Sequence, residues 1–151
     1  MKGSFTRRRF TQALLALAAF AAVPLGALAR SDEAFKARSS DAALELLFGD
    51  RPLQESDAFT FKVPNIAEDG SIVPVTVSAD GMEGVKSISL FVDANPNPLS
   101  ARFHFMPGAV PEFKTRIKMG ESSDVRAIVE TEGGLYVATK NVKVTLGGCG
   151  G

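Results

Sequence analysis

Apolar and polar residues alternate along most of the chain from Phe59 to its C-terminal end. This period of two is typical of half-buried β-strands, because successive side chains of a strand point to opposite faces of a sheet. The strands that it predicts are Phe59 to Val63, Ile72 to Val77, Val85 to Val92, Ala101 to Met106, Phe113 to Met119, Val125 to Val129 and Leu135 to Leu146. The last segment fits one long strand or two shorter ones, and Pro74 confines its own strand to an edge or an irregular position.

The segments between these strands contain Gly, Pro, Asn and Asp, and Asn95-Pro96-Asn97-Pro98 is the strongest turn signal among them. No helical stretch separates the strands, so the pattern contains no unit of a parallel sheet. An all-β fold follows, and we expect an immunoglobulin-like antiparallel β-sandwich.

Helical patterns precede the strands. Asp32 to Arg38 is a short helical candidate, and Ser40-Asp41 can cap a second helix over Ala42 to Phe48. Gly49 is expected to end that helix in a left-handed conformation, and Pro52 prevents it from resuming. We therefore expect one or two short N-terminal helices that pack against the sandwich.

The first residues have the pattern of an export signal. Arg7, Arg8 and Arg9 precede a short apolar run from Ala13 to Leu28, which closes on small residues at Ala29. Consecutive arginines of this kind resemble a twin-arginine signal, which predicts cleavage after Ala29 and a periplasmic location. A retained membrane anchor is the alternative, but the run is shorter than the roughly 20 residues that a spanning helix needs.

The sequence therefore predicts four regions: 1–29 twin-arginine signal peptide, 30–58 N-terminal helical segment, 59–146 β-sandwich and 147–151 flexible C-terminal arm. Removal of residues 1–29 leaves 13 basic and 17 acidic residues, a net charge of about −4. A mature chain of about 122 residues is sufficient for one domain with a hydrophobic core. Its acidic balance argues against nucleic acids and anionic membranes as partners.

Cys149 is the only cysteine, and it is flanked by Gly147, Gly148, Gly150 and Gly151. No disulfide can therefore form within the chain. Glycines resist ordering and have no side chains to pack, so we expect this tail to stay exposed as a flexible arm. Fully extended, the arm would take the thiol about 10 Å beyond Leu146.

Three interpretations of Cys149 remain open: an inert tail, a disulfide that links two copies, or a thiol that is loaded and presented to other proteins. A thiol enzyme is less consistent with the sequence, because a glycine tether cannot hold the cysteine beside a base. The only histidine, His104, is expected to face solvent from a strand rather than to bind a metal. We expect no catalytic residue, no metal site and no cofactor.

Lys114, Arg116 and Lys118 alternate along one predicted strand, so they share one face. They form either a solvated strand that deters edge pairing or part of a contact with a partner or an anion. Glu112 and Glu121 are close enough in sequence to neutralise them. A second charged group, expected to be a solvated surface, consists of Asp50, Glu55 and Asp57 near Arg51.

The terminal Gly147-Gly148-Cys149-Gly150-Gly151, the turn at Asn95 to Pro98 and the twin-arginine signal resemble the SoxY family of sulfur carriers. The resemblance implies that Cys149 carries sulfur covalently as a cysteine S-thiosulfonate during thiosulfate oxidation. It further implies that separate enzymes, SoxAX, SoxB and SoxCD, act on this cargo and that the carrier itself catalyses nothing. The expected stable partner is SoxZ, in a heterodimer.

Overall fold

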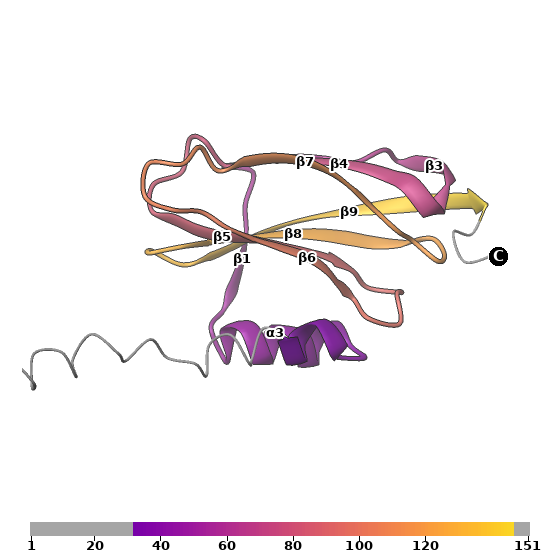
Figure 1. The fold of residues 1–151 in the computed structure, drawn as a ribbon, viewed down its shortest axis with the longest axis horizontal. Coiled ribbons are helices and arrows are strands. Elements are labelled where there is room, and N and C mark those ends of the chain that lie inside the picture. The colour runs from indigo at the N-terminus through magenta and orange to yellow at the C-terminus, as the bar shows by residue number, and fades with distance from the viewer. Residues whose placement is uncertain (1–31, 147–151) are drawn as a thin grey trace, which may run out of the picture.

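The structure, a computed structural model, describes residues 32–146. Two β-sheets pack face to face, and a helix covers the outer side of the larger one (Figure 1). The large sheet has the strand order β1-β9-β8-β5-β6, with β3 also paired to β9, and the small sheet has the order β2-β4-β7. This arrangement confirms the predicted immunoglobulin-like sandwich.

The strands of the large sheet are β1 (Leu53–Glu55), β3 (Ile66–Asp69), β5 (Val85–Val92), β6 (Leu99–His104), β8 (Ser123–Thr131) and β9 (Leu135–Leu146). Those of the small sheet are β2 (Thr60–Lys62), β4 (Val73–Ser78) and β7 (Glu112–Ile117). All seven predicted strands are present, and the last forms one continuous strand, β9. β4 is the central strand of the small sheet, so the prediction of an edge or irregular position was wrong. Pro74 is accommodated because it pairs only with Arg116 of β7, while β2 pairs with β4 from Thr76 to Ser78.

Two short strands, β1 and β3, were not predicted. Both run parallel to β9 and pair with different parts of it, β1 near Leu135 and β3 near Leu146. They contain only three and four residues, too few for an alternating pattern to stand out. We predicted antiparallel strands, so the parallel pairing of β1 and β3 with β9 differs from the prediction.

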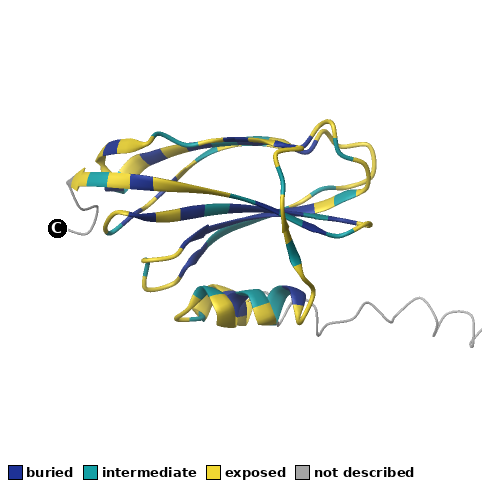
Figure 2. Cartoon of the chain, turned by 180° about the vertical axis from the view of Figure 1, so that it is seen from behind, coloured by how far each residue is buried: buried dark blue, intermediate teal, exposed yellow. Residues whose placement is uncertain are grey.

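The core lies between the two sheets, and buried positions alternate with more exposed ones along strands such as β4 (Figure 2). Its fully buried members include Val75 and Val77 of the small sheet and Ile88, Leu90 and Val129 of the large sheet. Removing such side chains from water stabilises the fold by about 1.5–3 kcal/mol each. The period-two pattern of the sequence thus corresponds to one continuous inner layer.

A second apolar layer lies on the other side of the large sheet. Phe91, Ile128 and Val137 point outward from the sheet and pack with Ala43 and Phe48 of α3 (Ser40–Phe48). Because both faces of β8 are covered, its burial is nearly continuous. The predicted N-terminal helical segment is therefore an integral layer of the fold.

The ends of α3 follow from its flanking residues. The side chain of Ser39 accepts a hydrogen bond from the backbone N–H of Ala42 at 3.2 Å, so the cap lies one residue before the predicted Ser40-Asp41. Gly49 has a φ of 62° and donates its N–H to the carbonyl of Glu45, as a residue ending a helix should. Residues 32–36 form a separate helical turn. No helix in the described part of the chain is long and apolar enough to span a membrane.

The turn at Asn95 to Pro98 connects β5 with β6 and also holds neighbouring segments in place. Asn95 donates its side-chain N–H to the carbonyl of Lys118 and accepts the backbone N–H of Gly120. Asn97 donates to the carbonyl of Ala37. The turn is therefore fastened to the connection between β7 and β8 and to the segment before α3.

Candidate functional site

The predicted attachment residue, Cys149, and its flanking Gly147, Gly148, Gly150 and Gly151 lie outside the described residues. The strand that leads to them is described to its end. β9 ends at Leu146, three positions before the cysteine, at the end of the sandwich where β3 lies (Figure 1). The candidate site is accordingly built from the surroundings of this strand end.

Hydrogen bonds from two sides hold the last residues of β9. The N–H of Lys143 donates to the carbonyl of Asn65 at 2.9 Å, and the N–H of Val144 donates to the hydroxyl of Ser122 at 2.9 Å. The hydroxyl of Thr145 donates to the carbonyl of Glu68 at 3.1 Å. The register with β3 continues to the last residue, where Asp69 lies opposite Leu146. The base of the predicted arm is therefore a fixed point on the sandwich.

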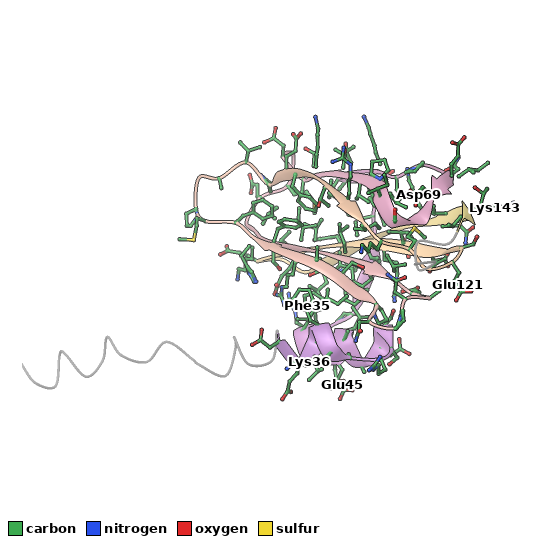
Figure 3. All side chains as sticks on the ribbon, turned by 45° about the vertical axis from the view of Figure 1, so that its right-hand side comes forward. Phe35, Lys36, Glu45, Asp69, Glu121 and Lys143 are labelled. Carbon is green, nitrogen blue, oxygen red and sulfur yellow. The ribbon has the colours of Figure 1, made fainter. Side chains whose placement is uncertain are left out.

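The surface around this base is partly apolar and partly charged. Ile66 and Ile72 are 60% and 58% exposed, a large fraction for isoleucine. Asp69, Glu121 and Lys143 lie at the same end of the molecule (Figure 3). This exposed apolar and charged surface surrounds the point where β9 ends.

Asp69 is held by the turn that follows it. Its carboxylate caps η2 (Gly70–Ile72) by accepting the backbone N–H of Ser71 at 2.7 Å. The pKa of Asp69 lies below its ordinary value, chiefly because the hydroxyl and then the backbone N–H of Ser71 donate to the charged form. A fixed negative charge thus lies opposite the last residue of β9.

His104 lies on β6 and is exposed, as predicted. Its pKa is lowered, first by partial burial and then by the positive charge of Arg102, while Glu130 opposes the shift. Among residues 32–146, no cluster of His, Cys, Asp and Glu has the composition of a metal site.

Arg51 and its acidic neighbours in sequence do not form one unit. Asp50, Glu55 and Asp57 are exposed, in agreement with the predicted solvated surface. Arg51 instead binds Glu130 of β8, with 2.7 Å between Nη1 and Oε1. The two residues are 79 positions apart, so no local sequence pattern could have indicated the pair.

Lys114, Arg116 and Lys118 are all exposed on the outer side of the small sheet. Neither Glu112 nor Glu121 forms an ion pair with any of them among the described residues, although Glu112 shares their exposed face of β7. Sequence reasoning missed a fourth cation of this surface, Lys62 of β2. Its signal was present, because Lys62 occupies the outward position between Phe61 and Val63.

Sequence reasoning also missed the polar groups that fix the end of β9. Asn65 and Glu68 act through backbone carbonyls, which any residue type would provide, so their roles have no sequence signature. Ser122 acts through its hydroxyl, yet a serine in a predicted turn has many common roles.

A comparison with solved structures places the fold among known proteins. The sulfur carrier protein SoxY from Chlorobium limicola f. thiosulfatophilum is 40% identical, with a TM-score of 0.63 over 70% of this chain and 96% of that one. A superoxide reductase variant (neelaredoxin) from Ignicoccus hospitalis has a TM-score of 0.53 over 61% of this chain and 94% of that one. Its 23% identity indicates a shared fold alone.

No curated protein matches the chain. The sequence profile of the family described as "Sulfur oxidation protein SoxY" matches residues 44–149, a span that begins in α3 and ends at the cysteine. That span covers the sandwich, the fixed end of β9 and the predicted attachment residue, so the chain belongs to the SoxY family of sulfur oxidation proteins.

Proposed function

We propose that this protein is a covalent carrier of sulfur intermediates in periplasmic thiosulfate oxidation and that Cys149 is the attachment residue. One observation carries the proposal: the family match extends to residue 149, three positions beyond a strand whose end is fixed by hydrogen bonds. A firm base with a short glycine-rich extension suits a thiol that has to enter the active sites of other proteins.

The loading step is an oxidation. The Cys149 thiol loses its proton, and its sulfur forms an S–S bond with the sulfane sulfur of thiosulfate. Two electrons leave the pair and pass to the haem enzyme, SoxAX. SoxB then hydrolyses the terminal sulfonate to sulfate, and a sulfane dehydrogenase such as SoxCD oxidises the sulfur that stays on the cysteine. An S–S bond suits this role because thiolates can also break it by exchange.

In this proposal the chain supplies attachment and position, while the chemistry belongs to the enzymes. The partner is a SoxZ-like subunit in a heterodimer, and the N-terminal arginines direct export by the twin-arginine pathway. No cofactor is needed by the carrier itself. An exposed carrier thiol is also open to oxidation, so we expect disulfide-linked dimers in purified material kept without a reductant.

Intact-protein mass spectrometry of carrier from thiosulfate-grown cells tests the proposal. We expect a mass increase that corresponds to thiosulfate or added sulfur, maps to the C-terminal peptide and disappears on reduction. The Cys149→Ser variant should lack the adduct while it keeps its fold and its partner.

An unmodified thiol in the presence of active processing enzymes would contradict the carrier function. If non-reducing electrophoresis then showed the disulfide dimer to be the working state, the chain would be an exported binding module instead.

A further inference from the structure

We propose that the outer face of the small sheet docks the enzymes that receive Cys149, through an acidic surface beside the entrance to their active sites. The inference rests on the carrier function proposed above. The basic face, as we name this surface, consists of Lys62, Lys114, Arg116 and Lys118.

Strand register brings the four cations together. Lys62 of β2 lies opposite Thr76 of β4, and Thr76 in turn lies opposite Lys114 of β7, so both lysines project from the same side of the sheet. Arg116 and Lys118 follow Lys114 at alternate positions and are exposed like it. Nitrogen-tipped side chains accordingly project from the outer side of β4 and β7 (Figure 3).

The basic face stands out against the charge of the rest of the molecule. Residues 32–146 contain 12 basic and 17 acidic residues. Four of the basic residues lie on this face, and Glu112 is the one acidic residue in β2, β4 and β7. The remainder of the described chain has eight basic and sixteen acidic residues. None of the four cations pairs with a carboxylate within the described part of the chain.

Unpaired like charges on neighbouring positions repel one another, so this arrangement costs stability in the isolated carrier. An acidic partner would relieve the repulsion, and complementary charges speed the encounter between two proteins and set their orientation. The rest of the carrier is acidic and would be repelled by the same partner. Charge alone therefore directs an acidic enzyme surface to this one face.

The basic face also has a hollow that could accept a side chain. A depression of about 230 Å³ lies between β4 and β7, lined among others by Pro74, Thr76, Lys114 and Arg116. The planar guanidinium of arginine can bind both oxygens of one carboxylate. An aspartate or glutamate of the partner would fit this combination of shape and charge.

The position of the basic face suits an enzyme that receives the arm. Val73 pairs with Ile117, and the N–H of Met119 donates to the carbonyl of Gly70 at 2.7 Å, so the Lys118 end of the face adjoins η2. η2 in turn packs beside β9. Because Cys149 reaches only about 10 Å beyond Leu146, a receiving enzyme has to cover this end of the molecule. Exposed Ile72 gives it an apolar contact between the base of the arm and the basic face.

Enzymatic loading of the carrier tests the inference. The variant Lys114→Glu/Arg116→Glu is compared with Lys36→Glu/Arg38→Glu, which changes the net charge equally at exposed residues near α3. With purified SoxAX and thiosulfate at low salt, we expect kcat/KM for the first variant to fall about tenfold or more and for the control to change little. The wild-type rate should fall as salt is raised. Equal rates for the two variants would overturn the inference.

Chemical loading separates docking from the chemistry of the thiol. The Cys149 thiolate attacks tetrathionate, displaces thiosulfate from it and so forms the S–S bond of the adduct. This reaction needs neither an enzyme nor a further oxidant. Both variants should react like the wild type. If the Lys114→Glu/Arg116→Glu variant lost this reaction, its slower enzymatic loading would come from the thiol and not from docking. If it lost the SoxZ-like partner on co-purification, the slower loading would come from the missing partner. Either result would overturn the docking proposal. If tetrathionate loads the wild type and active SoxAX does not, the carrier function itself fails.

Discussion

Arg102 of β6 and Glu130 of β8 form an ion pair on the side of the large sheet that α3 covers, with 3.0 Å between Nη2 and Oε2. Glu130 also accepts hydrogen bonds from Ser87 at 2.8 Å and from Arg51 at 2.7 Å. The guanidinium of Arg102 lies 5.3 Å from the centre of the Phe48 ring. One carboxylate thus links three strands, the segment before β1 and, through Arg102, the helix.

Glu130→Gln should destabilise the fold, because it leaves the positive charge of Arg102 without its partner at a side chain that is only 10% exposed. We expect the free energy of unfolding to fall by about 3 kcal/mol, as measured by urea denaturation. Glu132→Gln is the matched control at a neighbouring exposed position and should change it by no more than about 0.5 kcal/mol. Equal midpoints for the two variants would show that the pair contributes nothing.

The same carboxylate makes stability depend on pH. Burial alone would raise the pKa of Glu130, but hydrogen bonds from Arg51 and Ser87 and the charges of Arg102 and Arg51 hold it below its ordinary value of 4.5. The folded state therefore binds this proton less readily than the unfolded state does. Its stabilisation is complete above pH 4.5 and is lost as the pH falls through the lowered pKa.

Urea denaturation between pH 6 and pH 3.5 measures this dependence. The wild type should lose more stability over this range than Glu130→Gln does, and the difference between them isolates Glu130 from other carboxylates such as Asp69. Parallel curves for the two proteins would contradict the assignment.

Asn95→Ala should loosen the attachment of the β5–β6 turn to the connection between β7 and β8. It removes a donor at 2.8 Å from the carbonyl of Lys118 and an acceptor at 3.1 Å from the N–H of Gly120. We expect a loss of about 1–2 kcal/mol in thermal or urea unfolding, because two hydrogen bonds are lost, one of them partly buried. Asn97→Ala removes one long, exposed hydrogen bond and serves as the control with a smaller effect.

Gly147→Val/Gly148→Val should slow the transfer of sulfur to the processing enzymes. Branched side chains restrict the backbone and widen the chain where it has to pass into an active site. The positions follow the last residue of β9, so the unfolding midpoint should stay unchanged. The measurement is the turnover of each enzyme with this variant as its carrier. Unchanged turnover by all of them would refute the idea that glycine is needed for entry.

Much of the fold could be predicted because its information is local. Val85 to Val92 matches β5 at both ends, because its apolar residues Ile88, Leu90 and Val92 occupy alternate positions that face the core. The pattern did not indicate that Ser87, Ser89 and Phe91 are buried as well. β1 and β3 could not be predicted, because their existence depends on the edge of β9, which lies far away in sequence. The same limitation applies to the pairing of Arg51 with Glu130 and to the hydrogen bond between Ser122 and Val144.

The candidate site divides in a similar way. The proposed attachment residue, Cys149, comes from the sequence, because a lone cysteine among four glycines has few structural uses, and its role stays a prediction. The base of the arm was not visible, because Asn65, Glu68 and Ser122 hold β9 by contacts between distant segments. For the basic face, the sequence predicted that Lys114, Arg116 and Lys118 share one face, because they alternate along one segment. It did not predict that Lys62 joins them, because that depends on the pairing of β2 with β4.

The fixed end of β9 determines the local concentration of the Cys149 thiol at a docked enzyme. A tether that starts at an immobile point and has a contour of about 10 Å keeps the thiol within a very small volume. Its effective concentration there is roughly millimolar or higher, however dilute the carrier is in solution. Under the proposed carrier function, an enzyme would therefore need little affinity for the cargo itself, and no intermediate would have to diffuse away between one reaction and the next.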